Sequence, residues 1–374
     1  MNQEYKICTK CIMDSSDPEI EFDENGACNH CREYDERANK ELYYNEAGQK
    51  KLKELVNEIK ENGKNKEYDC LIGVSGGTDS TFLLYNLKKL GLRPLAVHLD
   101  NGWDTELSVK NIEQVIKKLN VNLYTCVLDW EEFKDLQLSF LKASIANAEI
   151  PTDHAIFAVL FQTTVEKGIK YIISGGNIVT EAIMPESWMY DPKDWKLIKN
   201  IHQKFCKTKL KTFPHLTIFD YFYYTFIKKI KYIPLLNYIR YNKKEVFQVL
   251  EKELGWRNYG VKHYESVYTR FFQGYILPEK FNIDKRRAHF STLICSGQIT
   301  RKEALEEMKK SPYPNETLMK EDREYVIKKL GLAEEKFERI MRQPIKTHKD
   351  YPNDSIFFSK NSFFMKLARK IITH

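Results

Sequence analysis

The 374-residue sequence lacks any apolar run of the roughly 18 residues that a membrane-spanning helix requires. Its first ten residues, MNQEYKICTK, lack the apolar stretch of a secretory signal, so we expect a cytoplasmic protein. The lysine-containing G-x-x-x-x-G-K-[ST] loop is absent too. A soluble protein is therefore predicted, and lysine-assisted transfer of a terminal phosphate is not.

A disulfide framework is also not expected, although the chain has eight cysteines. Four of them form two C-x-x-C pairs near the N-terminus, and the other four are scattered at Cys70, Cys126, Cys206 and Cys295. This distribution favours metal binding in a reducing compartment. The net charge of +7 is modest and is compatible with a phosphate-bearing small substrate, a nucleic acid or an acidic protein surface.

The two cysteine pairs have the spacing of a structural zinc site. Sixteen residues separate the first pair from the second, and the predicted ligands are Cys8, Cys11, Cys28 and Cys31. Four thiolates around a tetrahedral zinc leave no open coordination position, so we expect this metal to be structural. His30 lies between two ligands and is not expected to bind the metal. The alternative is a redox role for a C-x-x-C pair.

Short apolar runs alternate with segments of helical length over about a hundred residues after position 65, as in YDCLIGVS followed by TDSTFLLYNLKKL. This alternation is typical of βα units that build a parallel sheet, so the predicted fold class is α/β. The predicted parts are a zinc-binding segment (1–40), the parallel-sheet domain (45–190), an aromatic and basic insertion (191–241), a helical C-terminal domain (242–345) and a tail (346–374).

The segment SGGTDS (75–80) directly follows an apolar strand and precedes the apolar helix face of Phe82, Leu83, Leu84 and Leu87. Glycines let backbone amides approach a phosphate, and the N-terminus of the next helix adds unpaired N–H donors and partial positive charge. Hydroxyls from Ser75, Thr78 and Ser80 complete the set. We therefore expect an anion in this loop. The alternative is a glycine-containing turn capped by Ser and Asp.

SGGTDS after a strand resembles the loop of the PP-loop ATP pyrophosphatases, which cleave ATP between the α and β phosphates and adenylate a substrate. The resemblance implies a parallel-sheet ATP pyrophosphatase domain in which Asp79 helps to hold magnesium. The implied ATP-binding residues are Ser75, Gly76, Gly77, Thr78, Asp79, Ser80, His98, Asp100, Gly175, Gly176 and Asn177. A turn residue is the alternative role for Asp100. Glu181 is a further candidate for magnesium or substrate.

Polar strings in the C-terminal half narrow the resemblance, among them KHYES (262–266), DKRRAH (284–289) and SGQITR (296–301). With the zinc knuckles and SGGTDS, they look like the N-acetyl sugar amidotransferase family of bacterial surface polysaccharide and flagellin glycan synthesis. That family's proposed reaction converts an acetamido group of a nucleotide-linked sugar into an acetamidino group, through an O-adenylyl intermediate that ammonia attacks.

This resemblance supplies the candidate residues for chemistry. Lys262, Arg270 and Arg287 would offset phosphate charge, while His263 or Glu265 would transfer protons. Substrate contacts are expected from His154, Glu181, Gln273 and His289. For each cationic residue, an ion pair on a helix is the alternative, and Thr152 or Asp153 acting as a helix cap explains the surroundings of His154 equally well.

Ammonia is expected from solution or from a separate glutaminase partner. Residue 2 is asparagine, so no N-terminal cysteine nucleophile follows Met1, and no segment is left over for a glutaminase domain. The aromatic stretch at 218–240 would suit a docking surface, although core packing is the simpler interpretation. Residues 357–372 would form a basic amphipathic helix if they are ordered.

Two other functions fit parts of the sequence. A tRNA sulfur-insertion enzyme would also combine zinc knuckles with a pyrophosphate loop, but such enzymes usually carry lysine where this chain has Thr78, and often hold extra paired cysteines. A nucleotide-binding or RNA-binding protein without catalysis is the second, with residues 196–231 as its basic surface. The intact loop argues against it, and no stable nucleic-acid complex is expected.

Overall fold

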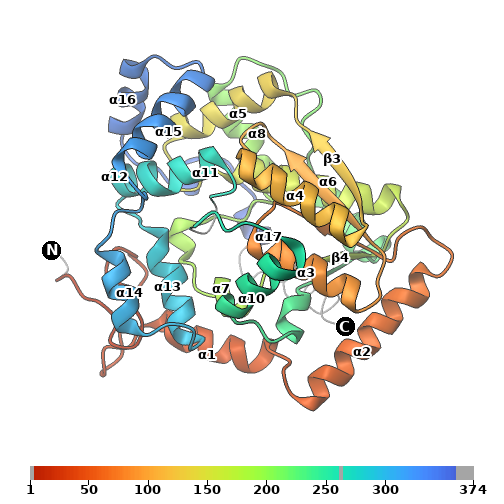
Figure 1. The fold of residues 1–374 in the computed structure, drawn as a ribbon. Coiled ribbons are helices and arrows are strands. Elements are labelled where there is room, and N and C mark those ends of the chain that lie inside the picture. The colour runs from red at the N-terminus through yellow and green to blue at the C-terminus, as the bar shows by residue number, and fades with distance from the viewer. Residues whose placement is uncertain (1–3, 261–263, 359–374) are drawn as a thin grey trace.

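The computed structural model describes residues 4–260 and 264–358, and a parallel β-sheet lies at its centre (Figure 1). The strands are β1 (Cys70–Gly73), β2 (Pro94–Asp100), β3 (Asn122–Val127), β4 (Tyr171–Ile173) and β5 (Lys231–Ile233). Their order is β3-β2-β1-β4-β5, and every neighbouring pair is parallel, which confirms the predicted α/β fold. The order reverses between β1 and β4, the position at which open α/β sheets bind ligands beyond the strand ends.

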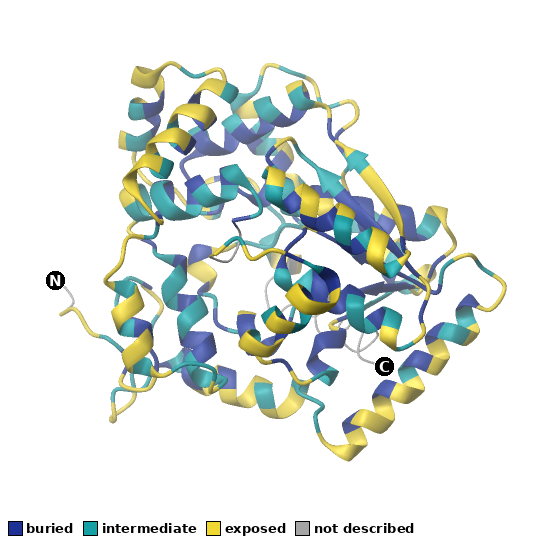
Figure 2. Cartoon of the chain, viewed as in Figure 1, coloured by how far each residue is buried: buried dark blue, intermediate teal, exposed yellow. Residues whose placement is uncertain are grey.

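Helices cover both faces of the sheet. On one face lie α3 (Thr78–Lys89), α4 (Glu106–Leu119) and α10 (Lys243–Val249), while α6 (Ile150–Glu166) covers the other. Because successive strand residues point to opposite faces, Ile72 packs with the first group and Leu71 with the second. Figure 2 shows the resulting burial, which is concentrated on the inner strands and on the inward sides of these helices, whereas the outer strand β3 is largely exposed.

The segment 191–241, expected to be an insertion, contributes to the main sheet. Its strand β5 pairs in parallel with β4, and α8 (Trp195–Phe205) packs against α5 (Trp130–Ala143). The following helix α10 and the π-helical turn η4 (Leu250–Leu254) pack on α3, so residues past 242 also belong to the core of the sheet domain. Packing therefore crosses both predicted boundaries, because apolar residues from these segments complete the two faces of the sheet.

A mostly helical C-terminal region follows and shares one core with the N-terminal cysteine segment. Helix α13 (Lys285–Cys295) contacts both α1 (Asn29–Glu41) and α7 (Ile178–Glu181) (Figure 1). The other helices of this region are α11 (Val267–Phe271), η5 (Phe272–Ile276), α12 (Leu277–Phe281), α14 (Arg301–Met308), α15 (Glu316–Lys329), α16 (Glu334–Arg342), η6 (His348–Asp350) and α17 (Ser355–Phe358). The helical region expected from the sequence is confirmed.

The remaining helical segments are short except for α2 (Glu46–Gly63). They are η1 (Glu186–Trp188), α9 (Ile218–Phe222), η2 (Tyr223–Ile227) and η3 (Leu235–Tyr238). Across 4–260 and 264–358, none of the helices combines the length and the apolar composition that crossing a bilayer requires.

Candidate active site

The β1–α3 loop requires glycine at position 76, and a side chain at position 77 would be crowded. Gly76 has φ +76°, and a Cβ there would lie 2.7 Å from the backbone oxygen of Ser108. At Gly77, the N-cap of α3, a Cβ would lie 3.0 Å from Ser75 Oγ. A left-handed conformation and close packing against α4 thus explain Gly76, while a side chain at Gly77 would crowd Ser75 Oγ. The sequence expectation of a close backbone turn at this position agrees with the geometry.

Backbone N–H groups of this loop meet hydroxyl oxygens. The Gly77 amide donates to Ser75 Oγ over 3.3 Å, and the Thr78 amide donates to the Tyr259 hydroxyl over 3.0 Å. Trp256 anchors the same region by donating from Nε1 to the Gly76 oxygen over 2.8 Å. Donors at the first turn of the 12-residue helix α3 lie where its dipole is positive, which is the arrangement that binds phosphate oxygens.

Asp79 lies in the first turn of α3 and accepts a short hydrogen bond from the Tyr241 hydroxyl. Burial and the neighbouring Asp79 carboxylate raise the pKa of Tyr241, so that this phenol stays protonated and remains a donor. Asp79 and Glu181 line one cavity, and both offer the carboxylate oxygens that Mg²⁺ prefers. These two residues would hold a magnesium ion between the loop and α7.

Two adjoining cavities open at the carboxyl ends of the strands. The loop cavity, about 460 Å³, is lined by residues 77–80, Tyr241, Lys243, Tyr259 and Arg286. The strand-end cavity, about 580 Å³, is lined by the ends of β1, β2 and β4. Residues that line both are Ser75, Gly175, Glu181, Glu265, Thr269, Gln273, Lys285 and His289. The shared wall therefore brings the sheet domain and the C-terminal region to one site.

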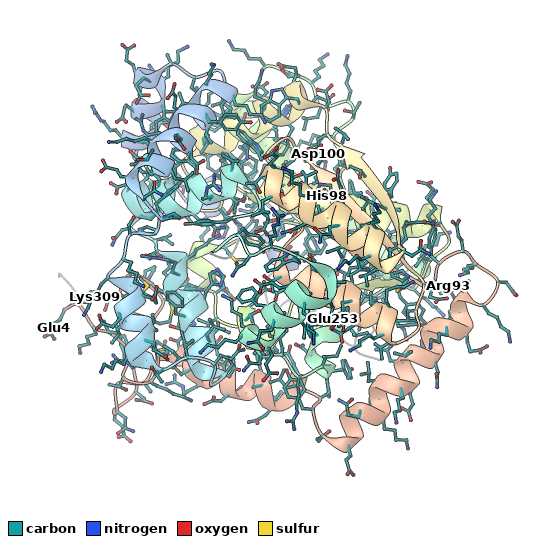
Figure 3. All side chains as sticks on the ribbon, viewed as in Figure 1. Glu4, Arg93, His98, Asp100, Glu253 and Lys309 are labelled. Atoms are coloured by element: carbon teal, nitrogen blue, oxygen red, sulfur yellow. The ribbon has the colours of Figure 1, made fainter. Side chains whose placement is uncertain are left out.

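His98 lines the strand-end cavity at the end of β2, where Figure 3 labels it beside Asp100. Its Nδ1 lies 2.9 Å from the Val74 oxygen and its Nε2 lies 2.9 Å from Asp104 Oδ2. Burial disfavours the charged ring, but the Asp104 carboxylate outweighs burial and raises the pKa of His98. Because both ring nitrogens face oxygen acceptors, the doubly protonated, cationic form fits best.

Asp100 has a local role. Its Oδ1 accepts from the Gly102 amide over 2.8 Å, and the residue lines neither cavity. The structure thus gives Asp100 the turn role that was the alternative to adenosine binding.

The loop after β4 lies against the β1–α3 loop. A Cβ on Gly175 would lie 3.4 Å from the Ser80 nitrogen, so the two loops are in van der Waals contact here. The Gly176 amide donates to Ser174 Oγ over 3.1 Å. Asn177 caps α7 by accepting from the Thr180 amide over 2.9 Å and lines neither cavity. Of the three predicted ATP contacts here, the structure brings Gly175 to the cavities.

A buried polar cluster lies on the shared wall and includes residues that sequence reasoning missed. Glu149 Oε2 accepts from Gln273 Nε2 over 2.9 Å and lies 3.6 Å from Lys285 Nζ. One helical turn later, Asp153 lines the strand-end cavity, and burial, reinforced by Glu149, raises its pKa to about 7. The sequence prediction names Arg287 and not Lys285, although the four-residue spacing of Lys285 and His289 puts these two on one helix face.

His154 does not reach the site. Its buried ring lies with Nδ1 2.7 Å from the Pro192 oxygen, while Nε2 accepts from the Leu216 amide over 3.1 Å. Burial lowers the pKa of His154 to about 4, which keeps the ring neutral and lets it accept at one nitrogen and donate at the other. The expected sugar contact is corrected, because both nitrogens hold the segment between Pro192 and Leu216.

Two predicted phosphate-neutralising arginines are occupied by structural partners. Arg287 donates to the Ile12 oxygen over 2.7 Å, lies 3.1 Å from Asp14 Oδ2, and lines neither cavity. Arg270 lines the loop cavity but binds Asp322 through two hydrogen bonds of 2.6 and 2.7 Å. The expected role of Arg287 is therefore corrected to a clamp on the N-terminal segment, and the charge of Arg270 is balanced by a buried carboxylate.

The candidate proton-transfer residues are placed only in part. Glu265 lies close to the loop, since a Cβ on Gly77 would be 3.3 Å from Glu265 Oε1. His289 lines both cavities. Lys262 and His263 lie outside the described residues.

The cysteine cluster fits a tetrahedral metal. The sulfur atoms of Cys8, Cys11, Cys28 and Cys31 all lie within 4.8 Å of one another, and the closer pairs are 3.6 to 3.8 Å apart. A tetrahedral zinc with Zn–S bonds of about 2.3 Å sets its sulfurs roughly 3.8 Å apart. Arg301 donates to the Cys8 and Cys11 oxygens and so ties the cluster to α14. The donor set and its burial suit a structural zinc.

Comparison with known proteins gives one family match. Residues 265–367 match the model for the LPS biosynthesis protein WbpG-like C-terminal domain. Among curated proteins, tRNA(Ile)-lysidine synthase of Chlamydia pneumoniae is 38% identical over 71 residues, covering 18% of this chain and 22% of that protein. The Chlamydia felis enzyme of that name is 49% identical over 45 residues, covering 12% and 14%. The chain thus spans less than a quarter of either relative.

Two solved structures show a distant likeness. NH3-dependent NAD synthetase from Campylobacter jejuni is 20% identical, with a TM-score of 0.27, over 35% of this chain and 58% of its own. NMN synthetase from Francisella tularensis is 13% identical, with a TM-score of 0.35, and the match covers 80% of this chain and 98% of that protein. The match over residues 265–367 agrees with the resemblance seen in the sequence motifs. Residues 265–367 are thus similar to the C-terminal domain of WbpG-like proteins of LPS biosynthesis.

Proposed function

We propose that this protein is an ATP-dependent amidotransferase that converts the acetamido group of a nucleotide-linked N-acetyl sugar into an acetamidino group. ATP would be cleaved to AMP and pyrophosphate, and ammonia would supply the nitrogen. The substrate class rests on the WbpG-like C-terminal domain, because that domain supplies part of the shared wall.

The observation that carries the proposal is the position of the phosphate-binding loop opposite that domain. Loop residues 77–80 and the family-matched residues Gln273, Lys285 and His289 line one continuous site. A diphosphate held by the loop amides would place the α phosphate toward the shared wall. An acceptor bound by the C-terminal domain would then meet the α phosphate at the junction of the two cavities.

The chemistry follows from the weak electrophilicity of an amide. The acetamido oxygen would attack the α phosphorus, the bond to the bridging oxygen would break, and pyrophosphate would leave. Ammonia would next add to the activated carbon and lose a proton, and cleavage of the carbon–oxygen bond would release AMP. Lys285, which lines both cavities, would offset phosphate charge, and Glu265 or His289 would accept the proton. Magnesium, held by Asp79 and Glu181, would neutralise the leaving diphosphate.

Partners and metal are part of the same proposal. The ammonia would come from solution or from a separate glutaminase subunit, and the reaction would occur in the cytoplasm, where nucleotide sugars are made. Zinc in the cysteine cluster would stabilise the fold, because four thiolates leave no position for substrate.

The alternative substrate is a transfer RNA, as in a tRNA thiolation enzyme. The short matches to tRNA(Ile)-lysidine synthases are compatible with it, whereas the family match in the C-terminal wall favours a sugar. Loss of a tRNA thiolation signal on deletion of the gene would support the RNA substrate.

The test is incubation of the protein with ATP, magnesium, ammonium and a panel of acetamido sugar nucleotides. We expect AMP, pyrophosphate and a sugar in which an NH group replaces the acetamido oxygen. Heavy oxygen placed in the acetamido group should appear in AMP, because that oxygen leaves with the adenylate. Formation of ADP, or AMP without the label, would overturn the proposed mechanism.

A further inference from the structure

Residues 218–227 form one short continuous helix, α9 followed by η2, that packs on the edge of the sheet. Its inner side is buried: Tyr221 and Thr225 face the core, and the Tyr221 ring lies 5.7 Å from the ring of Phe161 on α6. Ile230, just before β5, is buried in the same core cluster as Tyr221. The helix is therefore held firmly by one side.

The outer side of this helix is apolar. Phe219, Tyr223 and Ile227 have exposed fractions of 82%, 44% and 61%. A spacing of four residues places them in one stripe along a helix. Water-facing sides of helices normally carry polar residues, so this stripe is inverted relative to an ordinary surface helix. We call it the aromatic stripe.

Exposed lysines lie at the end of the aromatic stripe. Lys228 and Lys229 directly follow Ile227, and Lys228 Nζ lies 5.4 Å from the centroid of the Tyr223 ring. The acidic residue of the helix, Asp220, is bound at its beginning by Thr217 in a capping box. The charge next to the apolar side chains is thus positive.

This composition suits an anionic lipid surface better than a protein interface. Helices that lie in the bilayer interface bury an apolar and aromatic face and place lysines against anionic headgroups, whereas lysine is depleted in protein–protein interfaces. Ten residues of helix are about 15 Å long, half of the roughly 30 Å needed to cross the hydrocarbon core. The geometry points to a helix that lies on the membrane.

We propose that residues 218–229 bind the protein to the surface of an anionic phospholipid bilayer. Lys229 and Ile230 precede the amino end of β5, whereas the cavities open at the carboxyl ends of the parallel strands. The lysine end of the stripe therefore lies at the edge of the sheet opposite the site. Binding there would leave the site open to a soluble substrate.

The test is sedimentation of the full chain with vesicles. We expect binding to vesicles that contain phosphatidylglycerol, little binding to pure phosphatidylcholine, and weaker binding as salt rises. Phe219→Glu with Ile227→Glu should lower binding at least tenfold, because two charges would enter the apolar layer. Reversing both Lys228 and Lys229 to Glu should lower it about fivefold or more at low salt.

Two matched controls keep the result specific. Val127→Glu changes an equally exposed apolar residue, 69% exposed on the outer strand β3, and Lys117→Glu with Lys118→Glu reverses an exposed pair at the end of α4. Both should bind vesicles like the parent. Absence of vesicle binding by the parent, or equal loss in the Val127 variant, would overturn the proposal. A dimer that separates in the Phe219 variant without any vesicle binding would assign the stripe to self-association instead.

Discussion

The two walls of the loop cavity are built from different chemical groups. The wall at β1–α3 uses backbone amides and glycines, whose positions follow from a strand, a tight turn and a helix N-terminus. The opposite wall uses the charged side chains of Arg270 on α11 and Lys285 on α13, which pair with Asp322 and Glu149 from distant segments. A backbone site can be recognised in a short motif, whereas the availability of a charged side chain depends on which partner it meets in the folded chain.

The largest expected effect comes from loss of zinc from the cysteine cluster, which supports the side-chain wall. Cys28→Ser should lose zinc and lower the free energy of unfolding by about 5 kcal/mol, since the cluster and Arg287 tie the N-terminal segment to α13. Zinc content and urea unfolding measure this effect. Cys126→Ser is the control, because Cys126 lies away from the cluster on β3. An unchanged unfolding midpoint in the Cys28 variant would remove the structural-zinc hypothesis.

The second prediction tests the wall at β1–α3 through the carboxylate of Asp79. Asp79→Asn should lower AMP formation about 1000-fold by weakening magnesium binding, with little change in stability because Tyr241 can still donate to the amide oxygen. Acetamido-sugar-dependent release of pyrophosphate measures it. Asp100→Asn, in the turn outside the cavities, should keep nearly full activity. Equal losses in both variants would contradict the placement of the metal.

A pair of substitutions on α13 separates site residues from structural ones. Lys285→Met should lower kcat/KM for the sugar about 30- to 100-fold, because the variant removes a positive charge from a residue that lines both cavities. Arg287→Met should instead cost about 2 kcal/mol of stability, since Asp14 would stay buried without its cation. Steady-state kinetics and urea unfolding on both variants give the comparison. A reversed pattern would restore the catalytic role first predicted for Arg287.

The smallest effect concerns the pH dependence of His154. Its pKa is lowered by burial from 6.5 to about 4, so between these values the unfolded chain takes up a proton that the folded chain does not. Stability due to this group is present above pH 6.5 and is lost as pH falls, by about 3 kcal/mol at most by pH 4. The His154→Gln variant should be less stable than the parent at pH 7. Its free energy of unfolding should fall less than that of the parent on acidification.

Urea unfolding at several pH values measures the effect of His154→Gln, and the exposed His215 provides the control in His215→Gln. If His154→Gln instead raised KM for the sugar without changing stability, the structural role of this ring would be wrong.

The sequence by itself determined the parts that depend on local order. Alternating apolar runs and helices predicted the parallel sheet, SGGTDS predicted a glycine turn at a helix N-terminus, and the spacing of the two cysteine pairs predicted a cluster of four sulfurs. Each of these follows from backbone geometry or from spacing within a short segment, so no distant contact was needed to identify it.

Only the tertiary structure decided which charged groups face the site. Lys285 and Arg287 lie only two residues apart. Lys285 lines the cavities, whereas Arg287 binds the N-terminal segment, because α13 packs between the cavities and that segment. The structural role of His154 likewise follows from its contacts with Pro192 and Leu216. Segment 191–241 belongs to the sheet because its strand β5 pairs with β4. Such choices depend on contacts between segments far apart in the chain, which local patterns do not encode.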